Sequence, residues 1–538
     1  MNGKIGSRLT AAFYAAFSGT FLFLFLQVLL LNRWYFINTW KAFLSMLFWG
    51  AVLFAITRVV ALKKELSCRR AGIFVVSVLL IVLGIQLSLG YWFRIRPAFD
   101  VDAIYRGAIT WNQTGFLGNY MQYFCTFPNN LGGMLLLSLT FRLADVFGFT
   151  DYNAVATVLN CFLINCSFLL VFLICEKLFG LKRALCAFLF SVLCLPLLFY
   201  APVFYTDTLS ICFPALAYYL YLRAKETASS AKRAVLFALM GAAIAVGTVI
   251  KLTVLIMLIA IFIDLLLSGA VKRCLLPCLM SAAIVVASFA GMHVFQSRNL
   301  IGTTYREQNI PYTHWIMMGL NGVGSYNSRD YFFTRFFPNI EAKENADEQE
   351  IKTRIQQYTP VTFAKHLAKK ATYQFGSGLY AVNTMLDDNP QHRNWFHPYI
   401  TNTDPSDKTR FVDFSSFTQG YHLLLLLLTA LSGFAALRNR AGRNFSSPAP
   451  RLAVAGLLLF LIMWESNSRY LVNYLPVLVV CAFSGMDVWD GWLRKITECV
   501  RNRSHGSAHN RVGSCHDAGV SSAAKASKLK PIGELSFE

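Results

Sequence analysis

Acidic residues stand at a few places where long apolar segments end, and Asp100-Val101-Asp102 is the first of these places. Two carboxylates two residues apart can share a divalent cation, or one can act as a general base while a neighbouring cation holds the other. The alternative is a solvated turn whose acids pair with nearby arginines, namely Arg94, Arg96 and Arg106. The pattern by itself leaves both interpretations open.

A second acid and a single lysine lie in short connections between other apolar segments. Asp207, in Tyr205-Thr206-Asp207, can cap the helix that follows it or join Asp100 in one site. Lys251 stands alone between two apolar segments. Its side chain can anchor a helix end by reaching toward the membrane surface, or it can meet a lipid phosphate there.

A third polar group separates the last two apolar segments. It has the sequence Glu465-Ser466-Asn467-Ser468-Arg469-Tyr470. Both segments, 452–464 and 470–486, are shorter than the roughly 20 residues that cross a bilayer. We therefore expect Glu465 and Arg469 to lie below the membrane surface. They can form a helical i, i+4 ion pair that closes a hairpin. Alternatively, Arg469 presents its planar, bidentate donor group to a phosphate.

The segment Pro311-Tyr312-Thr313-His314-Trp315 precedes Asn321-Gly322-Val323-Gly324. Its aromatic residues, histidine and glycines are typical of a loop that faces a substrate, and His314 is the candidate residue there. The glycine pattern is not a phosphate-binding motif, because no strand and helix flank it.

Composition decides what kind of protein must position these groups. Of the 538 residues, 56% are hydrophobic and 14% are charged, and the mean hydropathy is +0.48. A soluble chain has about 45–50% apolar and about 25% charged residues, so a water-soluble enzyme is excluded. The net charge of +21 does not indicate nucleic acid. Basic residues gather in the cytoplasmic loops of membrane proteins, so the expected partner is the lipid bilayer.

Twelve apolar segments predict an all-α polytopic membrane protein of about twelve transmembrane helices. They are 10–31, 42–62, 71–93, 153–175, 184–201, 205–222, 234–250, 252–268, 275–295, 421–437, 452–464 and 470–486. A further apolar stretch, 130–148, opens with Gly132-Gly133 and carries Arg142 and Asp145. It is interpreted as an interfacial or re-entrant helix on the outer face.

Basic residues set the orientation. With 130–148 outside the count of spans, twenty Lys and Arg residues fall in the short loops assigned to the cytoplasm, and the short exterior loops hold only Arg33, Lys41, Lys251 and Arg469. The positive-inside rule then predicts a multi-pass cell-membrane protein with both termini cytoplasmic and its functional groups on the outer face.

This topology divides the chain into five parts. They are two N-terminal transmembrane helices (1–70), a transmembrane module (71–295) with a first exterior loop (94–152), an exterior soluble domain with a helical stretch near 344–375 (296–420), C-terminal transmembrane helices (421–486), and a basic, largely disordered cytoplasmic tail (487–538).

Three of these motifs together resemble the GT-C superfamily of integral-membrane glycosyltransferases, in particular the protein O-mannosyltransferase and aminoarabinose-transferase branch (glycosyltransferase family 39-like). The motifs are Asp100-Val101-Asp102, the segment Tyr123-Phe124-Cys125-Thr126-Phe127-Pro128-Asn129-Asn130 and Glu465-Ser466-Asn467-Ser468-Arg469-Tyr470-Leu471. The resemblance covers about residues 71–486. It implies a GT-C-like fold and a glycosylation reaction of the cell envelope.

The resemblance implies an inverting transfer of sugar from a polyprenyl-phosphate donor to a glycan, lipid or protein acceptor. Asp100 would be the base, Asp207 a second acid, and Arg469 with Lys251 would hold the donor phosphate. The Asp-Val-Asp form departs from the Asp-Glu or Glu-x-Asp of some branches and leaves the base between Asp100 and Asp102. Together with His314, the candidate substrate-binding residues are Lys251, Glu465, Arg469 and Tyr470, and the sequence identifies no cofactor with certainty.

Two further points stay open in the sequence. A divalent cation, where one is used, would bind at Asp100, Asp102 and Asp207. The alternative function is a transporter or flippase for a glycolipid or polysaccharide precursor, which would show two related halves and polar residues near the bilayer midplane. For the glycosyltransferase we expect Asp100 and Asp207 in one outward-facing cavity bordered by 130–148.

Overall fold

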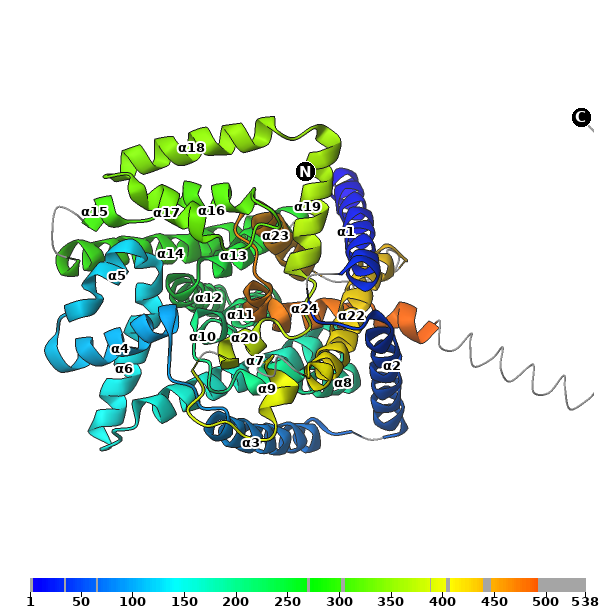
Figure 1. Ribbon diagram of the computed structural model, residues 1–538. Helices are drawn as coiled ribbons and strands as arrows, with labels where there is room; N and C mark the ends of the chain where they lie inside the picture. The colour runs from blue at the N-terminus through cyan, green and yellow to red at the C-terminus, as the bar shows by residue number, and fades with distance from the viewer. Residues whose placement is uncertain are drawn as a thin grey trace, which may run out of the picture. The chain divides into compact units, whose positions relative to one another are not determined.

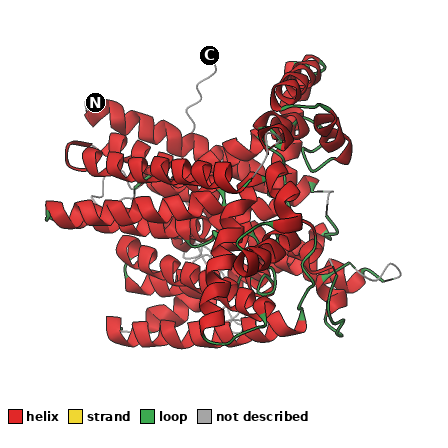
Figure 2. Cartoon of the chain, turned by 90° about the vertical axis from the view of Figure 1, so that its left-hand side faces the viewer, coloured by secondary structure: helices red, strands yellow, loops and turns green. Residues whose placement is uncertain are grey.

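The computed structural model describes residues 3–32, 35–63, 66–268, 271–300, 305–387, 389–402, 407–438 and 447–491. The described residues form helices joined by loops and contain no strand (Figure 2). Residues Met1–Val488 make one compact unit. A second unit begins at Trp489, of which only Trp489–Gly491 are described, so the expected basic tail lies outside the described residues.

Among the described residues, eight helices are long and apolar enough to cross a membrane, which confirms the all-α polytopic membrane class. They are α1 (Gly3–Leu31), α2 (Thr39–Leu62), α3 (Cys68–Trp92), α7 (Tyr152–Phe179), α12 (Ser230–Ile250), α14 (Val271–Asn299), α22 (Thr409–Arg438) and the C-terminal stretch Ser468–Gly491, which contains η4 (Ser468–Tyr474) and α24 (Leu475–Ser484).

The expected number of twelve spans differs from these eight, because four predicted segments are short or broken. Segment 184–201 divides into α8 (Leu181–Val192) and α9 (Leu195–Phe199), and 205–222 divides into α10 (Thr206–Leu209) and α11 (Phe213–Glu226). Pro196 and Pro214 stand in the first turns of α9 and α11, where a residue without an N–H can start a helix but cannot continue one. The other two segments are helical but short: η3 (Leu252–Val254) with α13 (Leu255–Ser268), and α23 (Ala449–Met463).

The apolar stretch predicted to lie at the interface forms α6 (Leu131–Val146), a helix of 16 residues. At 1.5 Å per residue it is about 24 Å long, which is less than the roughly 30 Å hydrocarbon core. It follows α4 (Phe99–Thr114), η1 (Gly118–Tyr120), α5 (Met121–Thr126) and η2 (Pro128–Asn130). Figure 1 shows α4, α5 and α6 grouped at one side of the helices. The short length agrees with the prediction of a helix that does not span.

The pair Gly132-Gly133 brings the start of α6 against two other elements. A Cβ atom on Gly132 would lie 2.0 Å from the carbonyl oxygen of Val249, two residues before the end of α12 at Lys251. A Cβ atom on Gly133 would lie 3.4 Å from Cγ2 of Thr206 in α10, an ordinary contact distance. The two glycines therefore allow α6 to pack directly beside the residues that precede Lys251 and Asp207.

In the described residues between α14 and α22 there are seven short helices. They are α15 (Tyr305–Gln308), α16 (Tyr312–Gly319), α17 (Ser328–Phe336), α18 (Ile340–Gln356), α19 (Pro360–Gln374), α20 (Val382–Asp387) and α21 (His397–Ile400). The helical stretch expected near 344–375 is thus two helices, because Thr359 caps α19 and Pro360 starts it. Helix α22 begins at Thr409, twelve residues before the predicted position.

The 296–420 segment was expected to be a domain of its own, but its described residues belong to the same compact unit as the transmembrane helices. Backbone pairing joins Ile95 to Pro390, and the Tyr200 hydroxyl donates a 2.6 Å hydrogen bond to the carbonyl oxygen of Tyr380. These bonds satisfy backbone groups of the segment with partners from the residues that follow α3 and α9. The segment therefore packs on the helices as a cover.

We expect Gly132→Ala to destabilise the protein and Gly133→Ala to leave its stability nearly unchanged. The first methyl group would overlap a backbone oxygen, and such overpacking typically costs about 1–3 kcal/mol. Thermal unfolding of both variants in the same detergent measures the difference. Equal melting temperatures for the two alanine variants would contradict the close contact between α6 and α12.

Candidate functional site

Eight polar and aromatic residues from four separate parts of the chain meet in one place, which we call the charged cluster. Its members are Asp100, Tyr123, Tyr205, Asp207, Lys251, Glu465, Arg469 and Tyr470. Six of them were candidates from the sequence alone. The ends and breaks of helices supply them all.

Helix ends put these side chains within reach of one another. Asp100 begins α4, and Asp207 lies in the short α10 between two broken segments. Lys251 ends α12 with an extended backbone, and Asn467 caps η4 by accepting a 3.1 Å hydrogen bond from the N–H of Arg469. In membrane proteins, irregular backbone is tolerated where protein buries it or where it lines a cavity. The breaks in the apolar segments are therefore where polar groups can be assembled.

Asp207 is the centre of the cluster. Its side chain is 2% exposed, and its Oδ1 accepts a hydrogen bond from the ammonium group of Lys251. Its Oδ2 lies 3.6 Å from Nε of Arg469. Because these charges are largely removed from water, each depends on the others for compensation. Asp207 is not an N-cap, since it lies within α10, which Tyr205 precedes, and Cys212 is the N-cap of the following helix α11.

Aromatic rings hold the two cations. The guanidinium carbon of Arg469 lies 4.7 Å from the ring centre of Tyr205 and 5.6 Å from that of Tyr470. Nζ of Lys251 lies 4.7 Å from the ring centre of Tyr470. Within the described part of the chain, Nε of Arg469 and Oδ2 of Asp207 make no hydrogen bond. Arg469 is thus fixed by ring contacts and keeps a buried donor for another acceptor.

Asp100 reaches the cluster through two tyrosines. Its Oδ1 accepts a 2.8 Å hydrogen bond from the Tyr123 hydroxyl, and its Oδ2 accepts one of 2.9 Å from the Tyr205 hydroxyl. Asn130 donates in turn to the Tyr123 oxygen at 2.6 Å. Burial and the nearby Asp100 carboxylate raise the pKa of Tyr123, so this hydroxyl stays a donor. Since Asp100 is only partly buried, it is the carboxylate that a ligand can reach.

Glu465 does not pair with Arg469, so the predicted i, i+4 ion pair is wrong. Its Oε2 accepts a 2.8 Å hydrogen bond from the hydroxyl of Tyr470. The backbone is extended at Trp464 and at Asn467, and the helical register that the prediction assumed does not exist there. Burial raises the pKa of Glu465, which favours the uncharged carboxyl group.

Asp102 lies outside the cluster. Two residues after Asp100 on α4, it faces another direction and forms a 2.7 Å ion pair with Nε of Arg106. The solvated-turn interpretation thus holds for Asp102 and not for Asp100. In the described residues no three His, Cys, Asp or Glu side chains are grouped so that they could hold a metal ion. The suggested cation site at Asp100, Asp102 and Asp207 is therefore not formed.

His314 is also outside the cluster. It is fully buried, and its Nδ1 lies 2.7 Å from Oγ1 of Thr334. Asp347 accepts hydrogen bonds from Thr313 and Thr334, which joins α16, α17 and α18. Burial lowers the pKa of His314 to about 4, so it is neutral at physiological pH. Its contacts make it a packing residue, and the predicted substrate-facing role for it is not supported.

A lysine that sequence analysis did not identify supports the Glu465 segment. Lys370 in α19 is 1% exposed and donates a 2.8 Å hydrogen bond to the carbonyl oxygen of Gly319. Burial lowers its pKa to about 7, while the nearby Glu465 opposes that shift. The same region bonds the chain after Glu465, because the N–H of Ser466 donates to Gly324 at 2.6 Å. No sequence signal marks one buried lysine in a segment rich in lysine.

Tyr123 and Tyr205 were not predicted as site residues. Tyr123 begins the motif that ends at Asn130, and Tyr205 begins the motif Tyr205-Thr206-Asp207. A tyrosine in a chain with 15% aromatic residues carries little signal by itself. Their role follows only from the position of Asp100 between their hydroxyls. Asp100, Asp207, Lys251, Glu465, Arg469 and Tyr470 are brought together, as the sequence suggested.

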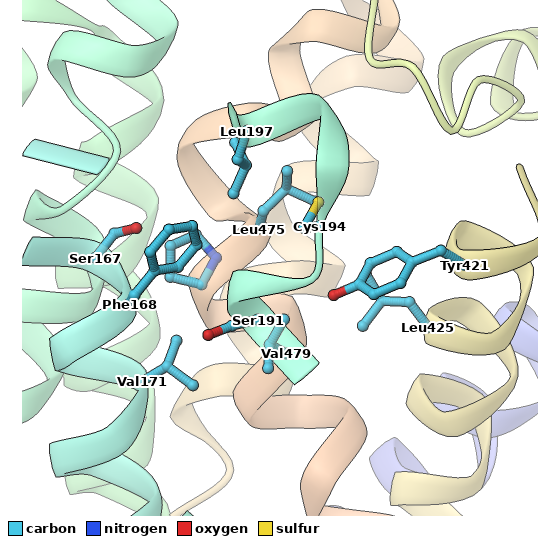
Figure 3. A pocket seen from close by; sticks show the side chains of 11 residues that line it. Ser167, Phe168, Val171, Ser191, Cys194, Leu197, Tyr421, Leu425, Leu475 and Val479 are labelled. Atoms are coloured by element: carbon cyan, nitrogen blue, oxygen red, sulfur yellow. The ribbon is translucent and has the colours of Figure 1, made fainter. Parts of the chain in front are cut away.

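Two cavities lie elsewhere. One of about 10 Å³, enough for roughly one water molecule, is lined by Ser167, Phe168, Ser191, Cys194, Tyr421 and Leu425 among others (Figure 3). The other, of about 330 Å³, lies between Asn321–Asn327 and Lys369. Neither is lined by residues of the charged cluster. The structure brings Asp100 and Asp207 into one cluster, and the outward-facing cavity expected there stays a prediction.

Fold and site together define a polytopic α-helical membrane protein whose interrupted helices enclose a buried group of charges. The family described as "conserved hypothetical integral membrane protein" matches residues 5–487, and the chain belongs to this family. The match includes every residue of the charged cluster. None of the curated proteins compared with the sequence matches it.

We expect Asp207→Asn to destabilise the protein by about 3–5 kcal/mol, because it leaves Lys251 and Arg469 buried without a carboxylate. The matched control is Asp102→Asn. Asp102 forms an ion pair with Arg106, and the two side chains are 28% and 60% exposed. Exposed ion pairs contribute about 1 kcal/mol or less to stability. Unfolding in detergent measures both variants. If Asp102→Asn cost as much as Asp207→Asn, the central role of Asp207 would be refuted.

We expect stability to rise as the pH increases from about 7 toward 10, with a contribution from Lys370 of at most about 1.4 kcal/mol per pH unit. The pKa of Lys370 is about 7 in the folded protein, whereas the ordinary pKa of a lysine is 10.5. Between these two pH values the unfolded chain therefore binds more protons than the folded protein. Melting temperatures of Lys370→Met should lack this rise. The exposed neighbour serves as control, since Lys369→Met should keep the wild-type slope.

Proposed function

We propose that the protein is an inverting glycosyltransferase of the cell membrane that moves a sugar from a polyprenyl-phosphate donor to an acceptor hydroxyl on the outer face. One observation carries the proposal. Two cations, Lys251 and Arg469, are held on the buried Asp207 beside Asp100, a carboxylate that a ligand can reach. A reaction that expels a phosphate and deprotonates a hydroxyl needs these two kinds of group close together.

The residues take the following roles. A carboxylate oxygen of Asp100 accepts the proton of the acceptor hydroxyl while its oxygen bonds to the anomeric carbon of the donor sugar. The bond from that carbon to the phosphate oxygen breaks on the opposite side, so the configuration inverts. The departing polyprenyl phosphate keeps the bonding electrons, and Lys251 and Arg469 stabilise its negative charge. Asp207 holds both cations in place and does not react.

The electrostatics of the cluster support an anionic ligand only if one acid is neutral. Burial raises the pKa of Glu465 and so shifts this acid toward its neutral form, and the hydrogen bond that Tyr470 donates to it opposes the shift. Nε of Arg469 forms an ion pair with Asp207 but no hydrogen bond, and the guanidinium lies over two tyrosine rings, so a phosphate oxygen suits it as a further acceptor.

The position of the charged cluster at one end of α12 supports its assignment to the outer face of the membrane. Lys251 ends this helix, whereas Lys232 and Arg233 lie in its first turn. Basic residues mark the cytoplasmic ends of membrane helices, so the opposite end faces outward. A base placed beside two cations also favours bond-making chemistry over the passage of a substrate, which needs no base.

The test uses the purified full-length protein with a panel of polyprenyl-phosphate sugars, and it measures donor binding, hydrolysis and transfer separately. Wild-type protein should bind at least one donor and release polyprenyl phosphate from it. If no donor binds and none is cleaved, the proposed function is refuted.

We expect Asp100→Asn to lower turnover by about 10²–10⁴-fold and to leave donor binding unchanged, because it removes only the base. Arg469→Lys should weaken donor binding and turnover together, since lysine lacks the planar fork that stacks on Tyr205. Asp102→Asn is the control and should keep wild-type activity. Full activity of Asp100→Asn would exclude it as the base.

A further inference from the structure

The larger cavity has the size and lining of a ligand site. Its volume is about 330 Å³, which lies at the lower end of the range for small-molecule pockets. It is lined by Asn321, Gly322, Val323, Ser325, Tyr326, Asn327 and Lys369. Asn321, Ser325, Asn327 and Lys369 place amide, hydroxyl and ammonium groups in a lining whose surface is otherwise largely apolar, and these groups donate and accept hydrogen bonds. Such a surface suits a ligand rich in hydroxyl groups.

The pocket wall is rigid because its polar residues are anchored from behind. Oδ1 of Asn327 accepts hydrogen bonds from two backbone N–H groups at the start of α17. Nδ2 of Asn321 donates to Asp330 at 3.2 Å, and the guanidinium of Arg354 holds Asp330 with bonds of 2.8 and 2.9 Å. Pre-organised polar groups lose little entropy when a ligand binds.

Tyr326 presents an aromatic surface in this pocket. Its side chain is 60% exposed, and its ring centre lies 6.5 Å from that of Tyr331. The faces of sugar rings carry C–H groups and pack on aromatic rings, while their hydroxyl groups bond to amides at the edge. A tyrosine supplies both an apolar face and a polar tip for such a ligand.

Two connections lead from the pocket to the charged cluster. One is a row of rings: Tyr331 stacks at 6.2 Å on Phe127, and Phe127 lies 5.3 Å from Tyr123, which donates to Asp100. The other is backbone, since the carbonyl oxygen of Gly324 accepts from the N–H of Ser466, next to Glu465. Burial, Tyr331 and then the Glu465 and Asp100 carboxylates raise the pKa of Tyr326.

We propose that this pocket binds the acceptor of the reaction, and that the acceptor is a sugar unit packed on Tyr326 with its hydroxyl groups bonded to Asn321 and Asn327. Lys369 adds a positive charge at the rim, so a sugar carrying a carboxylate binds more tightly than a neutral one. This inference rests on the proposed function and names the acceptor class: a glycan, in place of a protein side chain or a lipid without sugar.

The test measures binding of two probes, trigalacturonate and maltotriose, to the purified full-length protein by calorimetry. Tyr326→Ala should weaken both by about tenfold or more, because it removes the ring on which a sugar packs. Tyr312→Ala is a matched control, since Tyr312 is also 60% exposed and does not line the pocket. Lys369→Gln should weaken trigalacturonate binding only, whereas Lys352→Gln in α18 should weaken neither.

The outcomes separate this inference from the proposed function. Both Tyr326→Ala and Lys369→Gln alter exposed side chains, and unchanged melting temperatures verify that the variants fold. Absence of binding by both sugars, or binding that Tyr326→Ala leaves intact, overturns the acceptor pocket. Polyprenyl phosphate binding, measured in the same preparations, should be unaffected by Tyr326→Ala. A protein that binds sugars but no polyprenyl phosphate would refute the proposed function and leave the pocket standing.

Discussion

The buried carboxylate of Asp207 is the group on which the arrangement of this protein depends. It compensates the charges of Lys251 and Arg469, which come from segments more than two hundred residues apart in the chain. Neither cation could be buried there without it, since an uncompensated charge in a low-dielectric interior costs several kcal/mol. The end of α12, the short α10 and the start of η4 are therefore held in one place by a single side chain.

This requirement explains why several apolar segments are broken. A continuous helix satisfies its own backbone and turns its side chains to lipid or to neighbouring helices, but it cannot aim several polar groups at one point. The proline in the first turn of α11 and the extended residues around Lys251 and Asn467 interrupt the helices where the charges are needed. Close packing of α6 through Gly132 then closes the remaining side.

The segment between α14 and α22 completes the cluster from its other side. Lys370, buried against Gly319, and the bond from Ser466 to Gly324 fasten the loop that carries Glu465 and leads to Arg469. Because the same loop of residues 319–327 lines the 330 Å³ cavity, anything that binds there contacts a wall fixed to the charged cluster. Because this loop joins the cavity to the charged cluster, it supports the proposal of two neighbouring sites, one for the donor phosphate at Arg469 and one for the acceptor at Tyr326.

Hydrophobicity alone determined the class of this protein, because runs of apolar residues have few ways to avoid water other than as membrane helices. The candidate residues were also visible in the sequence, since isolated charges such as Asp207, Lys251 and Arg469 stand out in an apolar chain. The sequence further indicated that the stretch beginning at Gly132 differs from the spans.

Tertiary structure alone decided which of these charges are partners. The i, i+4 spacing favoured an ion pair between Glu465 and Arg469, but the backbone between them is extended. In the folded protein Arg469 pairs with the distant Asp207, and Glu465 accepts a hydrogen bond from Tyr470. Spacing equally could not separate Asp100 from Asp102, because the two differ only in the direction they face around α4. Long-range contacts carry no local sequence pattern, so the buried Lys370 and the tyrosines that hold Asp100 became recognisable only once the chain was folded.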